Sequence, residues 1–186
     1  MCKFIRITSY SEFQKNKNFS EYIFSAEKIY KKYSKYLLDD FYPYKDFGME
    51  ALIKLYSPYF WIILDGNDKF MGFVYLDNFV GNKNKLFSAE VSVCFDRCAW
   101  GNFVRYCAKF FFKMCFDVFG FYKLKAQIYP QNIYVRKLLK DCGFEYDTTL
   151  HSETLRLNIL QDIEVYCLYR KYYYKTTNNE VIYGNK

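Results

Sequence analysis

Cysteine is a common protein nucleophile, and cysteine and histidine supply most transition-metal ligands, but this chain arranges neither for such chemistry. Its seven cysteines include no Cys-x-x-Cys pair, and His151 is its single histidine. A zinc site needs several such ligands at set spacings, so we expect no metal. Most of the cysteines lie in apolar helical or strand-like patterns, which predict reduced, buried thiols that act as small hydrophobic side chains.

Asn132 is a second candidate, and it opens the stretch NIYVRKLLKDCGF. The apolar residues of this stretch recur at helical spacing, Pro130 stands just before it and Gly143 stops it, so the pattern predicts a short helix. Asn is a favourable N-cap because its side-chain oxygen accepts a hydrogen bond from an N–H of the first turn. Capping alone explains Asn132, and any further role depends on the rest of the chain.

Length and composition predict one folded domain. The chain has 186 residues, of which 52% are hydrophobic and 23% aromatic, and this excludes a disordered chain. No apolar run is long enough to span a bilayer, and an early charge argues against a signal peptide, so we expect a cytoplasmic protein with no membrane partner. We assign residues 1–175 to the domain and expect a loosely ordered tail over 176–186.

Hydrophobic patterns predict the elements that must position any site. Asn18 and Glu21 have capping-box spacing ahead of a long amphipathic helix, whose Tyr30, Tyr33 and Tyr36 we assign to the core. The predicted order is a strand in 3–9, helices in 19–37 and 49–56, strands in 59–64, 70–79 and 86–95, a helix in 103–119, a strand in 122–130, the short helix after Pro130, and strands in 144–150 and 163–173.

This order, together with four motifs, resembles the GNAT superfamily of acyl-CoA-dependent N-acyltransferases, especially the branch of ribosomal-protein N-terminal acetyltransferases. The family shows Asn, a small residue three places on, and Gly-Phe starting eleven places after the Asn, as at Asn132, Val135, Gly143 and Phe144. DGNDKFMGFVYL resembles the family's hairpin, SAEVSVCF its central strand, and DIEVYCLYR, with Asp162 and Tyr166, its closing strand.

The resemblance implies an α/β fold of the α+β kind. Its sheet is mostly antiparallel, with helices on both faces, and is splayed at its centre between the strand of Glu90 and that of Lys125. The implied activity is transfer of an acetyl group from acetyl-CoA to a primary amine of a protein or a small molecule. Acetyl-CoA enters as co-substrate, and no metal takes part.

The resemblance also implies roles for individual residues. Glu90 is the candidate base for the amine, because family members often place a Glu on this strand. The loop DRCAWGNF would offer N–H groups to the pyrophosphate at the start of a helix, where the helix dipole favours an anion. The pantetheine arm would lie along the central strand. The residues implied to bind acetyl-CoA are Val91, Val93, Arg97, Gly101, Asn102, Phe103 and Asn132.

Two positions depart from the family pattern. The family's loop reads Gln or Arg, two residues, Gly, one residue, then Gly or Ala, whereas here only Gly101 remains and Phe103 takes the last small position. The Tyr that many members use to protonate the leaving thiolate is replaced by Leu139. Tyr134 and Tyr169 are nearby alternatives, of which we take Tyr134 as the candidate catalytic residue.

These departures leave other functions open. One is a GNAT-fold protein that has lost acyl transfer and serves as a binding or assembly module, of a kind that a virus or mobile element would carry. Another is contact with nucleic acid, suggested by the net charge of +7 and by YRKYYYK at 169–175. It requires these basic residues to share a face with Arg97, Arg105 and Lys109. The acceptor and the oligomeric state, a homodimer included, are not fixed by the sequence.

Overall fold

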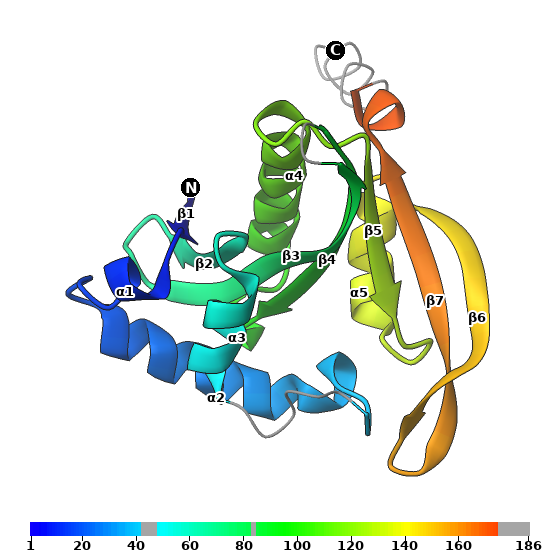
Figure 1. The fold of residues 1–186 in the computed structure, drawn as a ribbon, viewed down its shortest axis with the longest axis horizontal. Helices are drawn as coiled ribbons and strands as arrows, with labels where there is room; N and C mark the ends of the chain where they lie inside the picture. The colour runs from blue at the N-terminus through cyan, green and yellow to red at the C-terminus, as the bar shows by residue number, and fades with distance from the viewer. Residues whose placement is uncertain (42–47, 83–84, 175–186) are drawn as a thin grey trace.

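A seven-stranded sheet forms the centre of the protein, with helices on both of its faces (Figure 1). The computed structural model describes residues 1–41, 48–82 and 85–174, so the expected tail over 176–186 lies outside the described residues. The strands are β1 (Cys2–Ile7), β2 (Phe60–Asp65), β3 (Phe70–Asn82), β4 (Lys85–Phe95), β5 (Lys123–Ile128), β6 (Glu145–Arg156) and β7 (Ile159–Tyr169). Their order in the sheet is β1-β2-β3-β4-β5-β7-β6.

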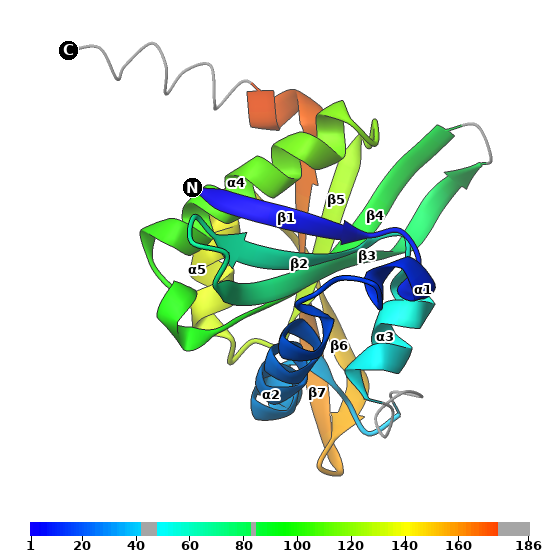
Figure 2. The same cartoon turned by 90° about the vertical axis from the view of Figure 1, so that its left-hand side faces the viewer.

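The pairing of the strands confirms the predicted sheet. Every neighbouring pair is antiparallel except β4 and β5, which are parallel. The predicted order of elements is also present, with two short additions, α1 (Tyr10–Phe13) and the 3₁₀ turn η1 (Arg97–Ala99). Helices α2 (Phe19–Leu37) and α3 (Met49–Tyr56) lie over one face, and α4 (Asn102–Asp117) and α5 (Ile133–Asp141) over the other (Figure 2).

Strand β2 shows why the sheet is covered on both sides. Phe60, Ile62 and Leu64 belong to the hydrophobic cluster under α2 and α3, and Trp61 and Ile63 belong to the cluster under α4 and α5. Successive side chains of a strand point to opposite faces, so an unbroken apolar run requires helices on both. The sequence FWIIL therefore fixes β2 at the middle of a three-layer structure.

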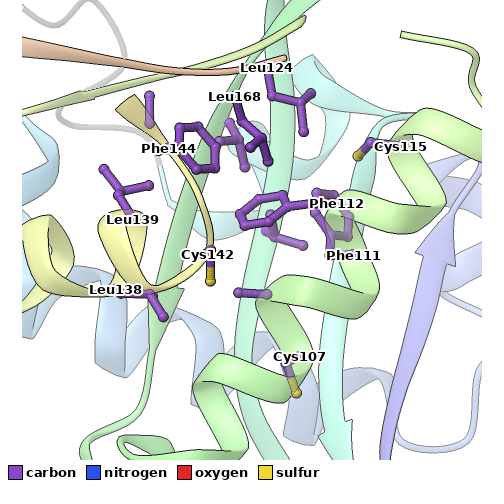
Figure 3. Close-up of a cluster of buried hydrophobic side chains, with 14 of the residues drawn as sticks. Cys107, Phe111, Phe112, Cys115, Leu124, Leu138, Leu139, Cys142, Phe144 and Leu168 are labelled. Atoms are coloured by element: carbon purple, nitrogen blue, oxygen red, sulfur yellow. The ribbon is translucent and has the colours of Figure 1, made fainter. Parts of the chain in front are cut away.

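The cluster under α4 and α5 joins the two halves of the sheet (Figure 3). Phe112 of α4 meets Phe144 edge to face, with ring centroids 5.1 Å apart, and Phe144 precedes β6 directly. Leu138 and Leu139 of α5 are buried in the same cluster. Because Leu124 of β5 and Leu168 of β7 also belong to it, these two helices hold β5 and β7 against the rest of the sheet.

The start of α2 corrects one detail of the prediction. The helix begins at Phe19, but the Asn18 side chain caps no backbone group and instead donates to the Tyr22 hydroxyl at 3.1 Å. The predicted capping box is therefore wrong, although the helix itself is confirmed. The first turn of α3 is capped from α2 instead. The Glu27 carboxylate accepts a hydrogen bond from the Met49 N–H at 2.6 Å, an N–H that has no partner within α3.

The sheet separates at its centre, where the prediction placed the splay. Strands β4 and β5 pair only at Ser88–Lys123, Ala89–Leu124 and Glu90–Lys125. Both strands continue beyond these pairs, β4 to Phe95 and β5 to Ile128, without further pairing between them, and their ribbons diverge (Figure 1). Within the described residues, no helix combines the length and the apolar character needed to cross a bilayer.

Candidate active site

A cavity of about 370 Å³ is bordered by the two strands where they part. Its walls come from β3, β4 and β5, from α4 and α5, and from the ends of α2 and α3. Four of the residues predicted from the sequence line it, namely Glu90, Val91, Val93 and Asn132. Tyr36 also lines it, which corrects its assignment to the core, whereas Tyr30 is buried in the core as predicted.

Glu90 lies on the cavity wall and is held by three donors. Its Oε2 atom is 2.9 Å from the Lys125 ammonium nitrogen, 3.0 Å from the Gln127 side-chain nitrogen and 3.3 Å from that of Asn78. The residue is only 9% exposed, whereas the Lys125 side chain is 33% exposed, so the carboxylate is the more shielded end of the ion pair. A buried carboxylate needs such partners, because an isolated buried charge is very costly.

Asp77 faces Glu90 from the neighbouring strand, and the sequence analysis did not identify it. The two residues are direct partners in the β3–β4 ladder, and both line the cavity. Burial, and then the negative charge of Glu90, raise the pKa of Asp77 to about 7, against the lowering effects of Lys125 and of a hydrogen bond from Tyr56. The cavity therefore contains a carboxyl group that changes charge near neutral pH.

Asn132 begins α5 as its sequence predicted. Its side-chain oxygen accepts a hydrogen bond from the Val135 N–H at 3.5 Å, and Gly143, with a left-handed φ of +88°, follows the helix. The turn before it is fixed by Arg136, which forms a two-pronged ion pair with Glu164 of β7, at 2.7 and 2.9 Å, and donates to the Pro130 carbonyl at 2.6 Å. Asn132 thus combines capping with a position on the cavity wall.

The loop between β4 and α4 turns through a left-handed glycine into the start of a helix. Asp96 accepts the Cys98 N–H at 3.0 Å and begins η1, and Gly101 then adopts a φ of +115° that favours glycine. Helix α4 starts at Asn102, so the N–H groups of its first turn have no partner within the helix. Phe103 packs partly against the core cluster.

The remaining predicted residues lie outside the cavity lining. Arg97 is exposed on η1, and Gly101, Asn102 and Phe103 form the turn into α4. Tyr134 is 71% exposed, and its ring lies edge to face against Trp100, with centroids 6.2 Å apart. Leu139, at the family's acid position, is buried and lines the cavity. The structure therefore brings Glu90, Val91, Val93 and Asn132 together at the cavity, whereas Tyr134 and the loop residues lie outside its lining.

The basic C-terminal stretch packs partly on α4. The Tyr173 hydroxyl donates to the Lys109 carbonyl at 2.9 Å, and its ring lies against Phe116, so Tyr173 is a packing residue. Lys171 and Tyr172 are exposed, and Lys175 lies outside the described residues. The segment thus adjoins Lys109, but one of its central aromatic rings is taken up by the core.

Cysteine and histidine make no cluster of their own. Five cysteines, Cys94, Cys107, Cys115, Cys142 and Cys167, are buried thiols that form no disulfide, and His151 is bound to Asp162 on the exposed β6–β7 hairpin at 3.2 Å. Across residues 1–41, 48–82 and 85–174, no three His, Cys, Asp or Glu side chains group as metal ligands would.

A sheet parted between β4 and β5, with a glycine loop entering a helix beside the opening, is the architecture of acyl-CoA-dependent N-acyltransferases. The family model "Acetyltransferase (GNAT) domain" matches residues 12–145, and the chain belongs to this family. GNAT acetyltransferases use acetyl-CoA as co-substrate. A comparison with curated protein sequences finds no match.

Solved structures share the fold at low sequence identity. The spermidine N-acetyltransferase of Vibrio cholerae, solved with CoA and spermine, has a TM-score of 0.68 at 16% identity, over 93% of this chain and 98% of that one. The ribosomal-protein-S5-alanine acetyltransferase of Vibrio fischeri has 0.67 at 14%, over 90% and 92%. A GNAT-family acetyltransferase of Bacillus anthracis has 0.68 at 9%, over 91% and 95%.

Proposed function

We propose that this protein is an acetyl-CoA-dependent N-acetyltransferase whose acceptor is a primary amine. The observation that carries the proposal is the cavity at the separated strands. From Val91 onward, β4 has no ladder partner on its β5 side, and this open edge borders a space of about 370 Å³. An unpaired strand edge offers N–H and C=O groups to an amide-bearing chain, which is the chemistry of a pantetheine arm.

The phosphate end of acetyl-CoA would bind at the start of α4. The first-turn N–H groups of Asn102 and Phe103, together with the positive end of a helix of 16 residues, favour an anion there. Gly101 supports this role, because a Cβ added to it would meet no atom within 4 Å, so the turn is open on its outer side. Arg97, exposed on η1, would add charge from the same loop.

The amine would enter from the carboxylate side of the cavity. Asp77, Glu90 and Asp39 line it, with Lys125 paired to Glu90, so a cationic amine is the acceptor that fits this lining best. In the chemistry, a carboxylate removes a proton from the ammonium group, and Asn132 orients the reacting ends. The two named Vibrio enzymes act on spermidine and on an S5 alanine, and these amines define the first acceptors to try.

Calorimetric titration with acetyl-CoA tests the proposal, with desulfo-CoA and buffer as reference titrations. Two variants form a matched pair. Gly101 and Gly120 stand at opposite ends of α4, both with left-handed φ and both with open space around an added Cβ. We expect micromolar binding that Gly101→Trp abolishes and Gly120→Trp leaves intact. Absence of binding at millimolar acetyl-CoA would contradict the enzyme and favour the binding or assembly module.

A further inference from the structure

We propose that Asp77 is the carboxylate that receives the acceptor's ammonium group and takes its proton, and that Glu90 is a fixed anion beside it. The inference rests on the proposed function and refines it, because the resemblance to the family assigns the proton to Glu90. Asp77 and Glu90 stand opposite each other in the β3–β4 ladder. Directly opposed residues share one face of a sheet, and both line the cavity.

One carboxylate oxygen of Glu90, Oε2, is already occupied by protein donors. Lys125 and Gln127 approach its Oε2 atom at 2.9 and 3.0 Å, and Asn78 adds a longer contact to the same atom. To bind an ammonium group at Oε2, or to accept a proton at that atom, Glu90 would have to give up part of this network. Breaking this ion pair leaves the Lys125 ammonium group, whose side chain is 33% exposed, without its partner, which is unfavourable.

Asp77 differs from Glu90 in that one of its carboxylate oxygens lacks a protein donor among the described residues. Its Oδ1 atom is buried, and among the described residues it has no hydrogen-bond partner. A hydrogen bond from Tyr56 reaches the same carboxyl group. Buried acceptors in native proteins nearly always have donors, so a bare carboxylate oxygen on a cavity wall needs a partner that enters the cavity. An ammonium group, with three N–H donors and a positive charge, supplies that partner.

The charges around Asp77 suit a proton acceptor. Burial and the charge of Glu90 raise its pKa, whereas Lys125 and the Tyr56 hydrogen bond lower it, and the result is about 7. A general base works best when its pKa lies near the working pH. An ammonium group bound beside Asp77 favours the ionised carboxylate, so the amine arrives next to a base that carries a negative charge.

The proposed step balances. Asp77 takes one proton from R–NH3+ and leaves R–NH2, whose lone pair forms the N–C bond to the acetyl carbon. The C–S bond breaks with its electron pair on sulfur, and the second proton that the nitrogen loses goes to that sulfur. Asp77 returns its proton to solvent. One ammonium ion and one thioester thus give one amide, one thiol and one proton.

Carboxyl ¹³C NMR tests the inference without knowledge of the natural acceptor, with n-butylammonium as the probe. Asp77→Asn and Glu90→Gln identify the two signals. We expect the Asp77 signal to titrate near pH 7, the value that burial gives its pKa, and to move when n-butylammonium is added. If n-butylammonium moves the Glu90 signal and leaves that of Asp77 unchanged, or moves neither in protein that binds acetyl-CoA, the inference is wrong.

Thiol release from acetyl-CoA with n-butylamine gives a second readout. Asp77→Asn should lower kcat at neutral pH about a hundredfold or more, and its rate should rise with pH toward the pKa of the free amine. Asp68→Asn is the control, since Asp68 lies exposed in the β2–β3 turn with a φ of +64°, which Asn adopts readily. Calorimetry with acetyl-CoA separates the two proposals: binding retained in Asp77→Asn with catalysis unaffected overturns only the inference, whereas no binding by the native protein overturns the proposed function and the inference with it.

Discussion

Two neighbouring regions of the sheet differ in how they use their side chains. Along β2, five of the six residues are buried, and all five are apolar. At the junction of β4 and β5, three residue pairs hold the strands together, and Glu90, a buried charged residue, lies beside a cavity. The first region gains stability from both faces, whereas the second keeps open space and charge.

The contrast explains where the site can form. Strand β2 has no free edge because it pairs with β1 and β3, and its packed faces leave no room for a ligand, because protein interiors pack as densely as organic crystals. The junction has both, since β4 and β5 part after Glu90 and Lys125. Helices α4 and α5 tie the two halves together from one side, so the sheet remains continuous although its ladder is not. The missing pairing between β4 and β5 should therefore lower the stability only of the residues around the junction.

The largest expected effect is in the apolar region. Trp61 is 1% exposed and packs edge to face on Phe111, with ring centroids 5.1 Å apart. Trp61→Ala should lower the free energy of unfolding by about 3–5 kcal/mol, because the deleted ring leaves a cavity. Urea unfolding followed by circular dichroism measures it. Val93→Ala, on the cavity wall, should cost about 1 kcal/mol or less. Equal losses of unfolding free energy in Trp61→Ala and Val93→Ala would contradict the view that β2 contributes more to stability than the cavity wall.

The second expected effect is a gain in stability, produced by the substitution Asp77→Asn. Asp77 has a pKa of about 7 in the folded protein and an ordinary value of 3.8, so the folded state holds its proton more tightly. Its contribution to stability is therefore greatest at low pH and falls as the pH rises from 3.8 to about 7. Asp77→Asn carries no charge and avoids this loss.

The advantage of Asp77→Asn over the native protein should grow by about 2 kcal/mol between about pH 5 and pH 8, after discounting for partial exposure. Urea unfolding of both proteins at each pH measures it. Glu12→Gln, a surface substitution at an exposed carboxylate paired with Lys15, should show no such trend. A gain that is the same at both pH values would mean that Asp77 is not titrating in this range.

The order of the elements followed from local patterns in the sequence, and the position of the splay followed from the resemblance to the GNAT family. Apolar periodicity placed each strand and helix, and the motifs around Glu90 and Asn132 located the parting strands. Asp77 could not be found in this way. It lies 13 residues before Glu90, and only the register across the β3–β4 hairpin, which includes two shifts, sets the two side chains opposite each other.

Other misses have equally specific causes. Asn18 has the sequence of a cap, but its side chain donates to Tyr22 instead. The β6–β7 hairpin turns at Leu157 and Asn158, both with left-handed φ, and the sequence has no glycine there to indicate a turn. Phe103, at the family's last small position, packs its side chain partly against the core, a contact that the loop sequence does not indicate.

A third prediction concerns the charge relation within the site. Glu90→Gln removes the negative charge that helps raise the pKa of Asp77, and it frees Lys125, which lowers that pKa. Both changes move the Asp77 titration, and the rising limb of the rate profile, to lower pH. Carboxyl NMR and initial rates over pH measure the two midpoints. A Glu90→Gln enzyme with no activity at any pH and an unchanged Asp77 midpoint would instead make Glu90 the base.

The smallest expected effect on stability is at the ion pair between Arg136 of α5 and Glu164 of β7. Arg136 binds Glu164 through two nitrogens and also donates to the Pro130 carbonyl, and this pair is mostly shielded, with the two side chains 28% and 17% exposed. Arg136→Lys keeps the charge but loses the planar fork, so it should lower the free energy of unfolding by about 1 kcal/mol. The comparison is Lys3→Gln, which removes an exposed pair with Asp68 and should cost less than about 0.5 kcal/mol.

Arg136→Lys should also affect binding, because Pro130 precedes the turn that positions Asn132. In calorimetry it should weaken acetyl-CoA binding severalfold, whereas Lys3→Gln should not. Loss of stability without loss of binding would show that Asn132 keeps its place without this clamp.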